Sequence, residues 1–189
     1  MACDSAWAFD DGLVLKGAGP VKIIRLPIEG TTSQALVGIC GDAGILCVLA
    51  QELEEQTLEK DADFHTIRTG IYKILDEKKL WDAFEGARTQ SEIVVAIESK
   101  VYRITNRDAY VEMLEAYTAI GSGALLAMGA LFATQTMSAP TAQWADTPLL
   151  QLKGAMKAAA TFDPTVSEPI HVFATTQTAV DKELSGQEK

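Results

Sequence analysis

The chain has 189 residues, which is the size of one domain, or of one domain with a small appendage. Acidic residues outnumber lysines and arginines by 26 to 16, and the resulting net charge of −10 gives no general attraction to nucleic acid or to an anionic membrane. The longest apolar run, 124–133, contains a glycine and is too short to cross a bilayer. We therefore expect neither a nucleic-acid partner nor a membrane partner.

Signals for secretion and for metal binding are also missing from the sequence. The first residues do not show a basic segment followed by an apolar one, as a secretory signal would. The three cysteines and two histidines do not follow the spacing of zinc ligands, and three cysteines cannot all pair within one chain. The sequence therefore predicts a reduced, cytoplasmic protein without a metal or another cofactor.

Apolar periodicity divides the chain into strand-like and helical stretches. Short β-branched or alternating runs predict strands, and apolar residues at spacings of three and four predict helices. Asp42 and Thr147 stand at the starts of two helical stretches, where they can cap free N–H groups. In chain order, we predict short strand pieces within 1–15, strands at 21–26 and 35–40, helices at 43–58 and 63–79, strands at 92–97 and 100–105, a short strand within 110–120 that ends at 118–120, helices at 124–134 and 148–162, and a strand at 169–175.

The predicted helices come in consecutive pairs instead of alternating singly with strands. This order disfavours a doubly wound parallel sheet and favours antiparallel sheets joined by hairpins, with a helix pair covering each sheet. The run 92–97 (EIVVAI) is apolar at nearly every position, as expected for a strand buried on both faces. We predict one α+β domain over 1–176 and a polar tail over 177–189 that frays.

Gly121-Ser122-Gly123 precedes the helix predicted at 124–134. Backbone N–H groups at a helix start favour an anion, and a serine adds a hydroxyl beside them. The same residues also suit a serine helix cap flanked by glycines, which is the simpler explanation of the motif taken alone. The segment is therefore a candidate site that needs support from elsewhere in the chain.

A second strand-to-helix junction contains Gly38 and Asp42. A glycine there lets a ligand approach the backbone and can present an N–H group to an oxyanion. A turn with an aspartate cap explains the same residues. The glycines at 38, 41 and 44 do not have the spacing of a dinucleotide-binding loop, and no βαβ unit follows them.

Three charged residues complete the candidates. Lys22 lies in an apolar strand, where partial burial would suit it to proton transfer, although an outward-pointing lysine on an edge strand is the simpler interpretation. Asp4 could orient such a lysine or begin a turn, and Asp163 follows a helix and precedes a proline. Because no histidine motif accompanies Ser122 and no G-x-S-x-G occurs, we do not expect a Ser-His-Asp hydrolase.

Taken together, these segments resemble proteasome β-type subunits and the bacterial HslV-type protease. AIGSGALLAMGAL (119–131) is similar to the family's AIGSG signature, which is followed by a helix of small residues. ACDS (2–5), VKIIRL (21–26) and LVGICGD (36–42) are similar to three further family segments and occur in the family's order. Asp163 falls near the family's late aspartate. The resemblance implies a four-layer αββα sandwich, the N-terminal-nucleophile hydrolase fold, over most of the chain.

The resemblance also implies roles for single residues. Asp4 and Lys22 would tune the proton balance of the active site, and Ser122 and Asp163 would support the nucleophile through hydrogen bonds. The family's nucleophile is the hydroxyl of an N-terminal threonine, whose own α-amino group serves as the base. A free α-amine titrates near pH 8, so no histidine is required. The reaction implied is amide hydrolysis through an acyl-enzyme.

Three glycines would bind the substrate in this comparison. Gly38 would supply an N–H group to the oxyanion hole, and Gly121 and Gly123 would lie beside it. The match departs from the family where the nucleophile should be, because the strand that carries it should precede Asp4. Only three residues do so here, and none of them is a threonine. We therefore expect the displayed chain to lack its first, nucleophile-bearing strand.

Two interpretations of that departure are open. In the first, the chain is a proteasome-like threonine-type peptidase subunit whose true start lies upstream and supplies Thr, Ser or Cys. In the second, it is a non-catalytic structural or scaffold subunit of the same fold. An amidohydrolase of the same superfamily that acts on a small amide is a third, more distant candidate. The retained Asp4, Lys22 and Ser122 favour the first interpretation.

The partners implied by the resemblance follow from the first interpretation. They are like subunits in a ring-shaped homo-oligomer, a peptide substrate where the subunit is active, and an ATP-dependent unfoldase as a further candidate. The small-residue helix after Ser122 suits close helix packing, either between subunits or within the chain.

Overall fold

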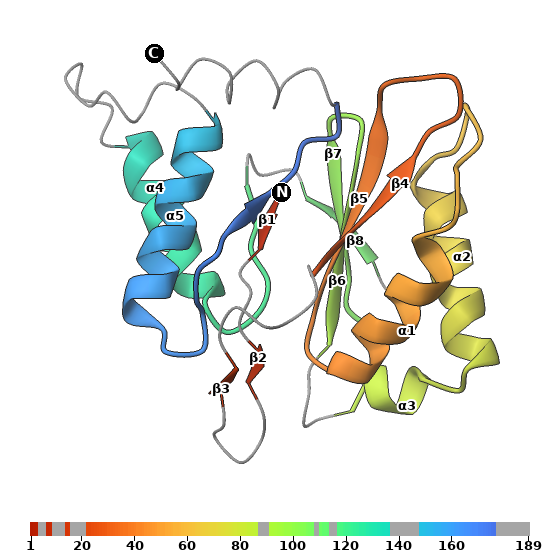
Figure 1. Ribbon diagram of the computed structural model, residues 1–189, viewed down its shortest axis with the longest axis horizontal. Coiled ribbons are helices and arrows are strands. Elements are labelled where there is room, and N and C mark those ends of the chain that lie inside the picture. The colour runs from red at the N-terminus through yellow and green to blue at the C-terminus, as the bar shows by residue number, and fades with distance from the viewer. Residues whose placement is uncertain are drawn as a thin grey trace. The chain divides into compact units, whose positions relative to one another are not determined.

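The computed structural model describes residues 1–3, 7–8, 14–15, 22–86, 91–107, 110–113, 117–136 and 148–176. The chain divides into two compact units, one formed by 1–22 with 115–172 and the other by 23–114 with 173–189. Figure 1 gives the course of the chain through its labelled elements. The predicted tail 177–189 lies outside the described residues, and a single domain over 1–176 stays a prediction.

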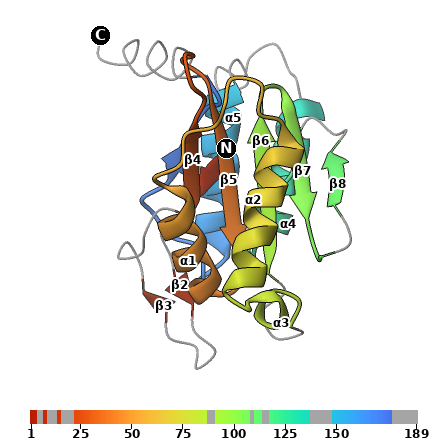
Figure 2. The same cartoon turned by 90° about the vertical axis from the view of Figure 1, so that its right-hand side faces the viewer.

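The unit that contains 23–114 is built on a five-stranded sheet in which every pairing is antiparallel (Figure 2). This confirms the antiparallel sheet that the order of elements predicts. Two of the strands, β5 and β6, are buried along nearly their whole length. In spatial order the strands are β4 (Ile23–Pro27), β5 (Gln34–Cys40), β6 (Glu92–Ile97), β7 (Lys100–Ile104) and β8 (Tyr110–Met113).

The short strand predicted within 110–120 is present, but its predicted end at 118–120 is wrong. The edge strand β8 lies at the start of the weakly apolar stretch 110–120, where Tyr110–Met113 is in register with Val101–Ile104 of β7. Residues 118–120 form no regular element. Cross-strand pairing with a neighbour decides where an edge strand forms, and the short apolar run at 118–120 carries no information about that neighbour.

Helices α1 (Ala43–Leu53) and α2 (Phe64–Glu77) cover one face of this sheet (Figure 2). Each helix begins at an aspartate that accepts hydrogen bonds from free backbone N–H groups. Asp42 Oδ1 lies 2.7 Å from the Gly44 nitrogen and 3.2 Å from the Ile45 nitrogen, and Asp63 Oδ1 lies 2.9 Å from the Thr66 nitrogen. Both caps follow from the short polar side chain at the position before the first helical turn.

Helix α1 ends at Leu53, five residues before its predicted end at 58. Leu58 instead lies beside the end of β4, where its nitrogen donates to the Pro27 oxygen at 2.8 Å and its oxygen accepts from the Glu29 nitrogen at 2.9 Å. The helical periodicity extends to Leu58 only because that side chain is also buried. In the sequence, an apolar residue that is buried in a strand-like bridge looks the same as one that is buried on a helix face.

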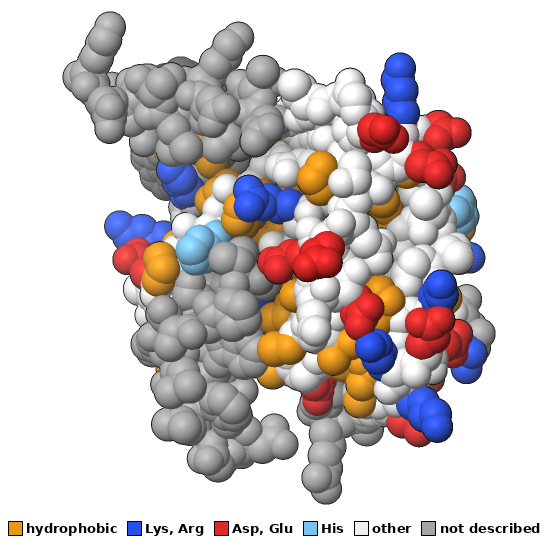
Figure 3. All heavy atoms as spheres, turned by 45° about the vertical axis from the view of Figure 1, so that its right-hand side comes forward, with side chains coloured by type: hydrophobic (Ala, Val, Ile, Leu, Met, Phe, Trp, Pro, Cys, Tyr) orange, Lys and Arg blue, Asp and Glu red, His pale blue; other side chains and the backbone are white. Residues whose placement is uncertain are grey.

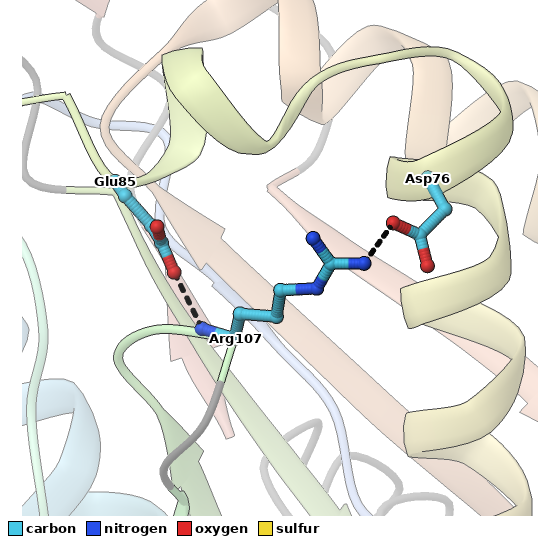
Figure 4. A network of polar contacts seen from close by, with 3 residues as sticks. All are labelled: Asp76, Glu85 and Arg107. Atoms are coloured by element: carbon cyan, nitrogen blue, oxygen red, sulfur yellow. Dashed lines mark hydrogen bonds and ion pairs between the residues drawn. The ribbon is translucent and has the colours of Figure 1, made fainter.

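A short helix, α3 (Trp81–Phe84), is absent from the sequence prediction and is tied to the β7–β8 turn through Arg107. The Arg107 guanidinium donates to Asp76 Oδ1 at 2.7 Å, and its backbone nitrogen donates to Glu85 Oε1 at 2.7 Å (Figure 4). The same guanidinium lies over the Trp81 ring, 5.5 Å from its centroid. These contacts link the turn to the ends of α2 and α3.

The other unit contains two short strand pairs and a helix pair. Strand β1 (Ala2–Cys3) pairs with β9 (His171–Val172), and β2 (Trp7–Ala8) pairs with β3 (Val14–Leu15), both antiparallel. Helices α4 (Ala124–Thr136) and α5 (Pro148–Phe162) lie side by side (Figure 1). A buried cluster contains Ala127 and Leu131 of α4, Ala155 and Ala159 of α5, and Val166, and its three alanines allow the helices to approach closely.

The strand predicted at 169–175 is shorter than expected. Only His171–Val172 forms β9. Residues 173–176 belong to the unit that contains 23–114, where Thr175 oxygen accepts from the Gln34 nitrogen and Thr176 forms a bridge with Ser33. The order of strands and helix pairs otherwise agrees with the prediction. The four-layer stacking and the missing first strand stay predictions.

Charged side chains of both signs are interspersed over the face drawn in Figure 3. Several of them form surface ion pairs, such as Lys78 with Glu52 and Lys100 with Glu112. No helix in the described part of the chain combines the length and apolar character needed to span a membrane.

Candidate functional site

The turn before α4 presents Ser122 to solvent. Gly121 adopts φ +91°, a left-handed conformation that favours glycine, and its oxygen accepts a hydrogen bond from the Ala124 nitrogen at 3.1 Å. Ser122 therefore lies at the tip of a tight turn directly ahead of the helix. The helix begins where Gly123 oxygen accepts from the Ala127 nitrogen at 3.0 Å.

Asp163 lies at the end of α5 and meets this turn through Thr165. Asp163 Oδ1 accepts two hydrogen bonds from Thr165, one from the backbone nitrogen at 2.8 Å and one from the hydroxyl at 2.6 Å. The Thr165 hydroxyl oxygen lies 2.7 Å from Ser122 Oγ. Two residues that are 41 positions apart in the sequence, Ser122 and Asp163, thus belong to one cluster through a third.

The environment of Asp163 favours its ionised form. Partial burial raises the pKa of this carboxyl, but hydrogen bonds from the Thr165 hydroxyl, the Thr165 backbone nitrogen and the Ser122 hydroxyl lower it more, so the pKa lies below its usual range. The cluster is therefore an anion with two hydroxyl groups at neutral pH. Such a group can hold a cation or orient a hydrogen-bond donor.

Gly123 brings the two halves of this cluster together. It is buried, and a Cβ atom at its position would lie 2.7 Å from Val166 Cγ2 and 3.2 Å from Ala159 Cβ. Any side chain would push the start of α4 away from the turn that carries Asp163 and Thr165. The second glycine of the motif is thus required by packing against α5.

The remaining predicted site residues belong to other parts of the chain. Gly38 lies within β5, opposite Ile23 of β4 and Val94 of β6. Lys22 directly precedes Ile23 and is partly buried. Asp4 lies outside the described residues. The structure therefore joins Ser122, Gly123 and Asp163, while the roles of Lys22, Gly38 and Asp4 stay predictions.

Sequence reasoning missed Thr165. Its signal was present, because an aspartate whose carboxylate accepts from the residue two positions later is a common turn, and Asp163-Pro164-Thr165 has that spacing. The contact with Ser122 has no comparable signal in the sequence.

Sequence reasoning also underrated Gly41. This glycine adopts φ +102°, and a Cβ there would lie 2.5 Å from the Ser91 Cα. The junction of β5 and α1 therefore needs Gly41 for structural reasons. Ser91 is buried beside it and accepts a hydrogen bond from the Asp42 nitrogen at 3.0 Å.

The described side chains contain no group of three or more His, Cys, Asp or Glu residues placed to hold a metal ion. The Ser122 cluster is built from one carboxylate and hydroxyl groups, with neither a histidine nor a second carboxylate in its hydrogen bonds.

Comparison with known proteins gives a clear result for the fold. No protein-family model and no curated protein matches the sequence. Among solved structures, BPH from Thiobacillus denitrificans in complex with epoxomicin superposes with a TM-score of 0.64 at 21% identity, over 91% of this chain and 89% of that one. A second BPH structure from the same organism gives 0.64 at 22% identity, with the same shares of the two chains. Eukaryotic HslV from Trypanosoma brucei gives 0.57 at 16% identity, over 90% and 88%.

The chain has the HslV fold. The resemblance that the GSG segment indicates is thus confirmed at the level of the fold, over about nine tenths of the chain. This HslV-like fold brings the GSG turn and the late aspartate, the two segments on which the resemblance depends most, into the Ser122 cluster.

Proposed function

We propose that this protein is a subunit of a proteasome-like, threonine-type peptidase that hydrolyses amide bonds through an N-terminal nucleophile. The observation that carries the proposal is the hydrogen-bonded cluster of Ser122, Thr165 and Asp163 in a chain with the HslV fold. A carboxylate and hydroxyl groups beside a glycine turn suit a site that positions an amine and a hydroxyl.

In this proposal the nucleophile is the first residue of the mature protein, a Thr, Ser or Cys. Its α-amine takes the proton from the hydroxyl or thiol, the oxygen or sulfur attacks the substrate carbonyl, and the amine then gives the proton to the leaving group. Ser122 and Asp163 support the amine, and Asp4 and Lys22 set the proton balance. The resemblance further gives Gly38 the role of an N–H donor to the oxyanion, and gives Gly121 and Gly123 a role in substrate binding.

The experiment that tests the proposal begins with the protein isolated from its native cells. Mass spectrometry of the mature chain identifies its first residue, and a fluorogenic peptide measures hydrolysis. We expect a Thr, Ser or Cys at the first position, and loss of activity when it is replaced by Ala. D163N should lower kcat by at least about tenfold, while D61N, at an exposed aspartate outside the cluster, should not.

Native protein that begins with another residue, or that forms its assembly but hydrolyses no peptide, would refute the peptidase. The second outcome would identify a scaffold subunit of the same fold, which is the alternative function.

We further propose that the protein acts in the cytoplasm as a ring-shaped homo-oligomer that receives peptide, with an unfoldase as a second partner. The apolar exterior of α4 supports assembly. This helix has no charged residue, and Leu125 and Phe132 on it are 87% and 61% exposed. A helix that is apolar on all sides is usually covered. Light scattering coupled to size-exclusion chromatography measures the mass, and a monomer at micromolar concentration would contradict the ring.

A further inference from the structure

The segment 173–176, which directly follows β9, is anchored on residues far from it in the sequence, and we call it the arm. The Gln34 nitrogen donates to the Thr175 oxygen at 2.8 Å, and Nε2 of the Gln34 side chain donates to the Ala174 oxygen at 2.7 Å. Gln34 therefore holds two consecutive carbonyl groups of the arm, one with its backbone and one with its side chain. The side-chain bond joins residues that are 140 positions apart.

Two further contacts support the arm. The Thr175 hydroxyl donates to the Glu98 oxygen at 3.1 Å, and the Arg25 guanidinium lies 5.4 Å from the centroid of the Phe173 ring. The Thr175 hydroxyl contact is exposed, whereas the side-chain bond from Gln34 is shorter and partly buried. A hydrogen bond that is lost from a partly buried place leaves its acceptor short of a partner, so Gln34 is the main anchor of the arm.

Strand β9 depends on an anchor of this kind. It has two residues, and it pairs with the two residues of β1. A two-stranded pair of this length is marginal in water, and the described part of the chain places no further strand beside β1 or β9. Because the arm begins directly after Val172, an anchored arm prevents β9 from becoming the frayed end of the ordered chain.

We propose that Gln34 is a positioning residue that holds the arm and thereby keeps β9 paired with β1. Its consequence for the reaction rests on the proposed function, in which the nucleophile is the first residue of the mature protein. β1 is the first strand of the described chain, and Gly38, the expected oxyanion donor, follows Gln34 by four residues in β5. Gln34 thus connects, through the arm, the strand nearest the proposed nucleophile with the strand that carries Gly38.

Hydrogen–deuterium exchange of the full chain tests the proposal, with mass spectrometry and fragmentation to single residues. Q34L removes the side-chain donor at nearly the same volume and keeps the backbone nitrogen that donates to Thr175. The chemical control is Q56L, because Gln56 Nε2 donates to the Glu52 oxygen at 2.8 Å, close by in the sequence. The stability control is I71V, since Ile71 is fully buried in α2 and its truncation costs about as much as one hydrogen bond.

The expected effect is confined to one strand pair. Q34L should speed exchange at β1 and β9 by about two- to tenfold, the range that loss of one hydrogen bond gives. Q56L and I71V should leave exchange at β1 and β9 unchanged, because neither change touches the arm. Wild-type exchange at β1 and β9 in Q34L would refute the proposal. An equal rise in I71V would also overturn it, because the effect would then reflect general stability.

A second variant covers the case in which Q34L does not fold. In Q34N the amide is kept on a side chain that is one methylene shorter, so it no longer reaches the Ala174 oxygen, while the backbone bond to Thr175 remains. Q34N should speed exchange at β1 and β9 as Q34L does. Wild-type rates there would show that the side-chain bond does not hold β9, against the proposal.

The effect on the reaction is measured separately, in the assembly isolated from native cells. Q34L should lower kcat several-fold and leave KM within about twofold, because Gln34 acts on the position of the nucleophile's strand and not on the substrate. Q56L should change neither constant. Unchanged kcat in Q34L beside faster exchange would overturn the positioning role. Wild-type protein that hydrolyses no peptide would instead refute the proposed function, and the exchange experiment would still decide whether Gln34 holds β9.

Discussion

The close approach of Gly123 to α5 gives the sharpest test of the site's architecture. A Cβ at this buried position would lie 2.7 Å from Val166 Cγ2 and 3.2 Å from Ala159 Cβ, both well inside ordinary contact distance. Val166 is 5% exposed and β-branched, so it cannot rotate away freely. We expect G123A to destabilise the protein by about 1–3 kcal/mol, the usual cost of overpacking. For a chain of this size that lowers Tm by about 2–12 °C.

The matched control is G129A in the same helix. A Cβ at Gly129 meets nothing within 4 Å, so alanine should stabilise the helix by about 0.5–1 kcal/mol. Calorimetry on both variants gives the difference in Tm. NMR reports whether the Asp163 pKa also rises in G123A as Ser122 moves away. If G123A and G129A have the same Tm, the packing argument for the GSG turn is wrong.

Three further predictions concern the unit that contains 23–114. G41A should lower the free energy of unfolding, measured in urea, by about 2–4 kcal/mol, because φ +102° strains alanine and its Cβ would overlap the Ser91 Cα. Adding S91G should not restore the stability, since the overlap is with the backbone of residue 91. Asp63 has its pKa lowered chiefly by the Thr66 backbone hydrogen bond, so it stabilises the folded state above its unfolded pKa, and this contribution is lost as pH falls through the lower folded pKa. The Tm of D63N should therefore change less below pH 4 than that of wild type, and equal slopes would contradict the cap. A double-mutant cycle of R107A with D76A should give a coupling of only about 0.2–1 kcal/mol, because both side chains are about half exposed, and a larger coupling would show that the pair is desolvated in solution.

Much of the secondary structure was predictable because it depends on nearby residues. The Asp42 and Asp63 caps, the strand at 92–97 and the start of the helix at 124 follow from local periodicity and from short polar side chains. Local patterns gave wrong element boundaries where pairing with residues distant in the sequence determines the structure. Leu58 is buried in a bridge to the end of β4 instead of on α1, and the edge strand β8 forms where β7 offers a partner.

The candidate site divides in the same way. The sequence alone marked the glycine-rich turn at Ser122 and the late Asp163, because glycines at a strand-to-helix turn and an aspartate before proline are visible in the chain. It also indicated an HslV-like fold, which comparison of the structures confirms. Only the tertiary structure could show that Thr165 meets Ser122, since this 2.7 Å contact joins residues 43 positions apart.

The acidic composition predicts neither a nucleic-acid nor a membrane partner, but it does not indicate that one carboxylate matters more than the others. The tertiary structure singles out Asp163, because two hydroxyl groups and a backbone N–H converge on it and hold its pKa low. Residue types and their order determine the local turns. The hydrogen-bond distances between Ser122, Thr165 and Asp163 arise only when the start of α4 packs against α5 and Val166 through Gly123.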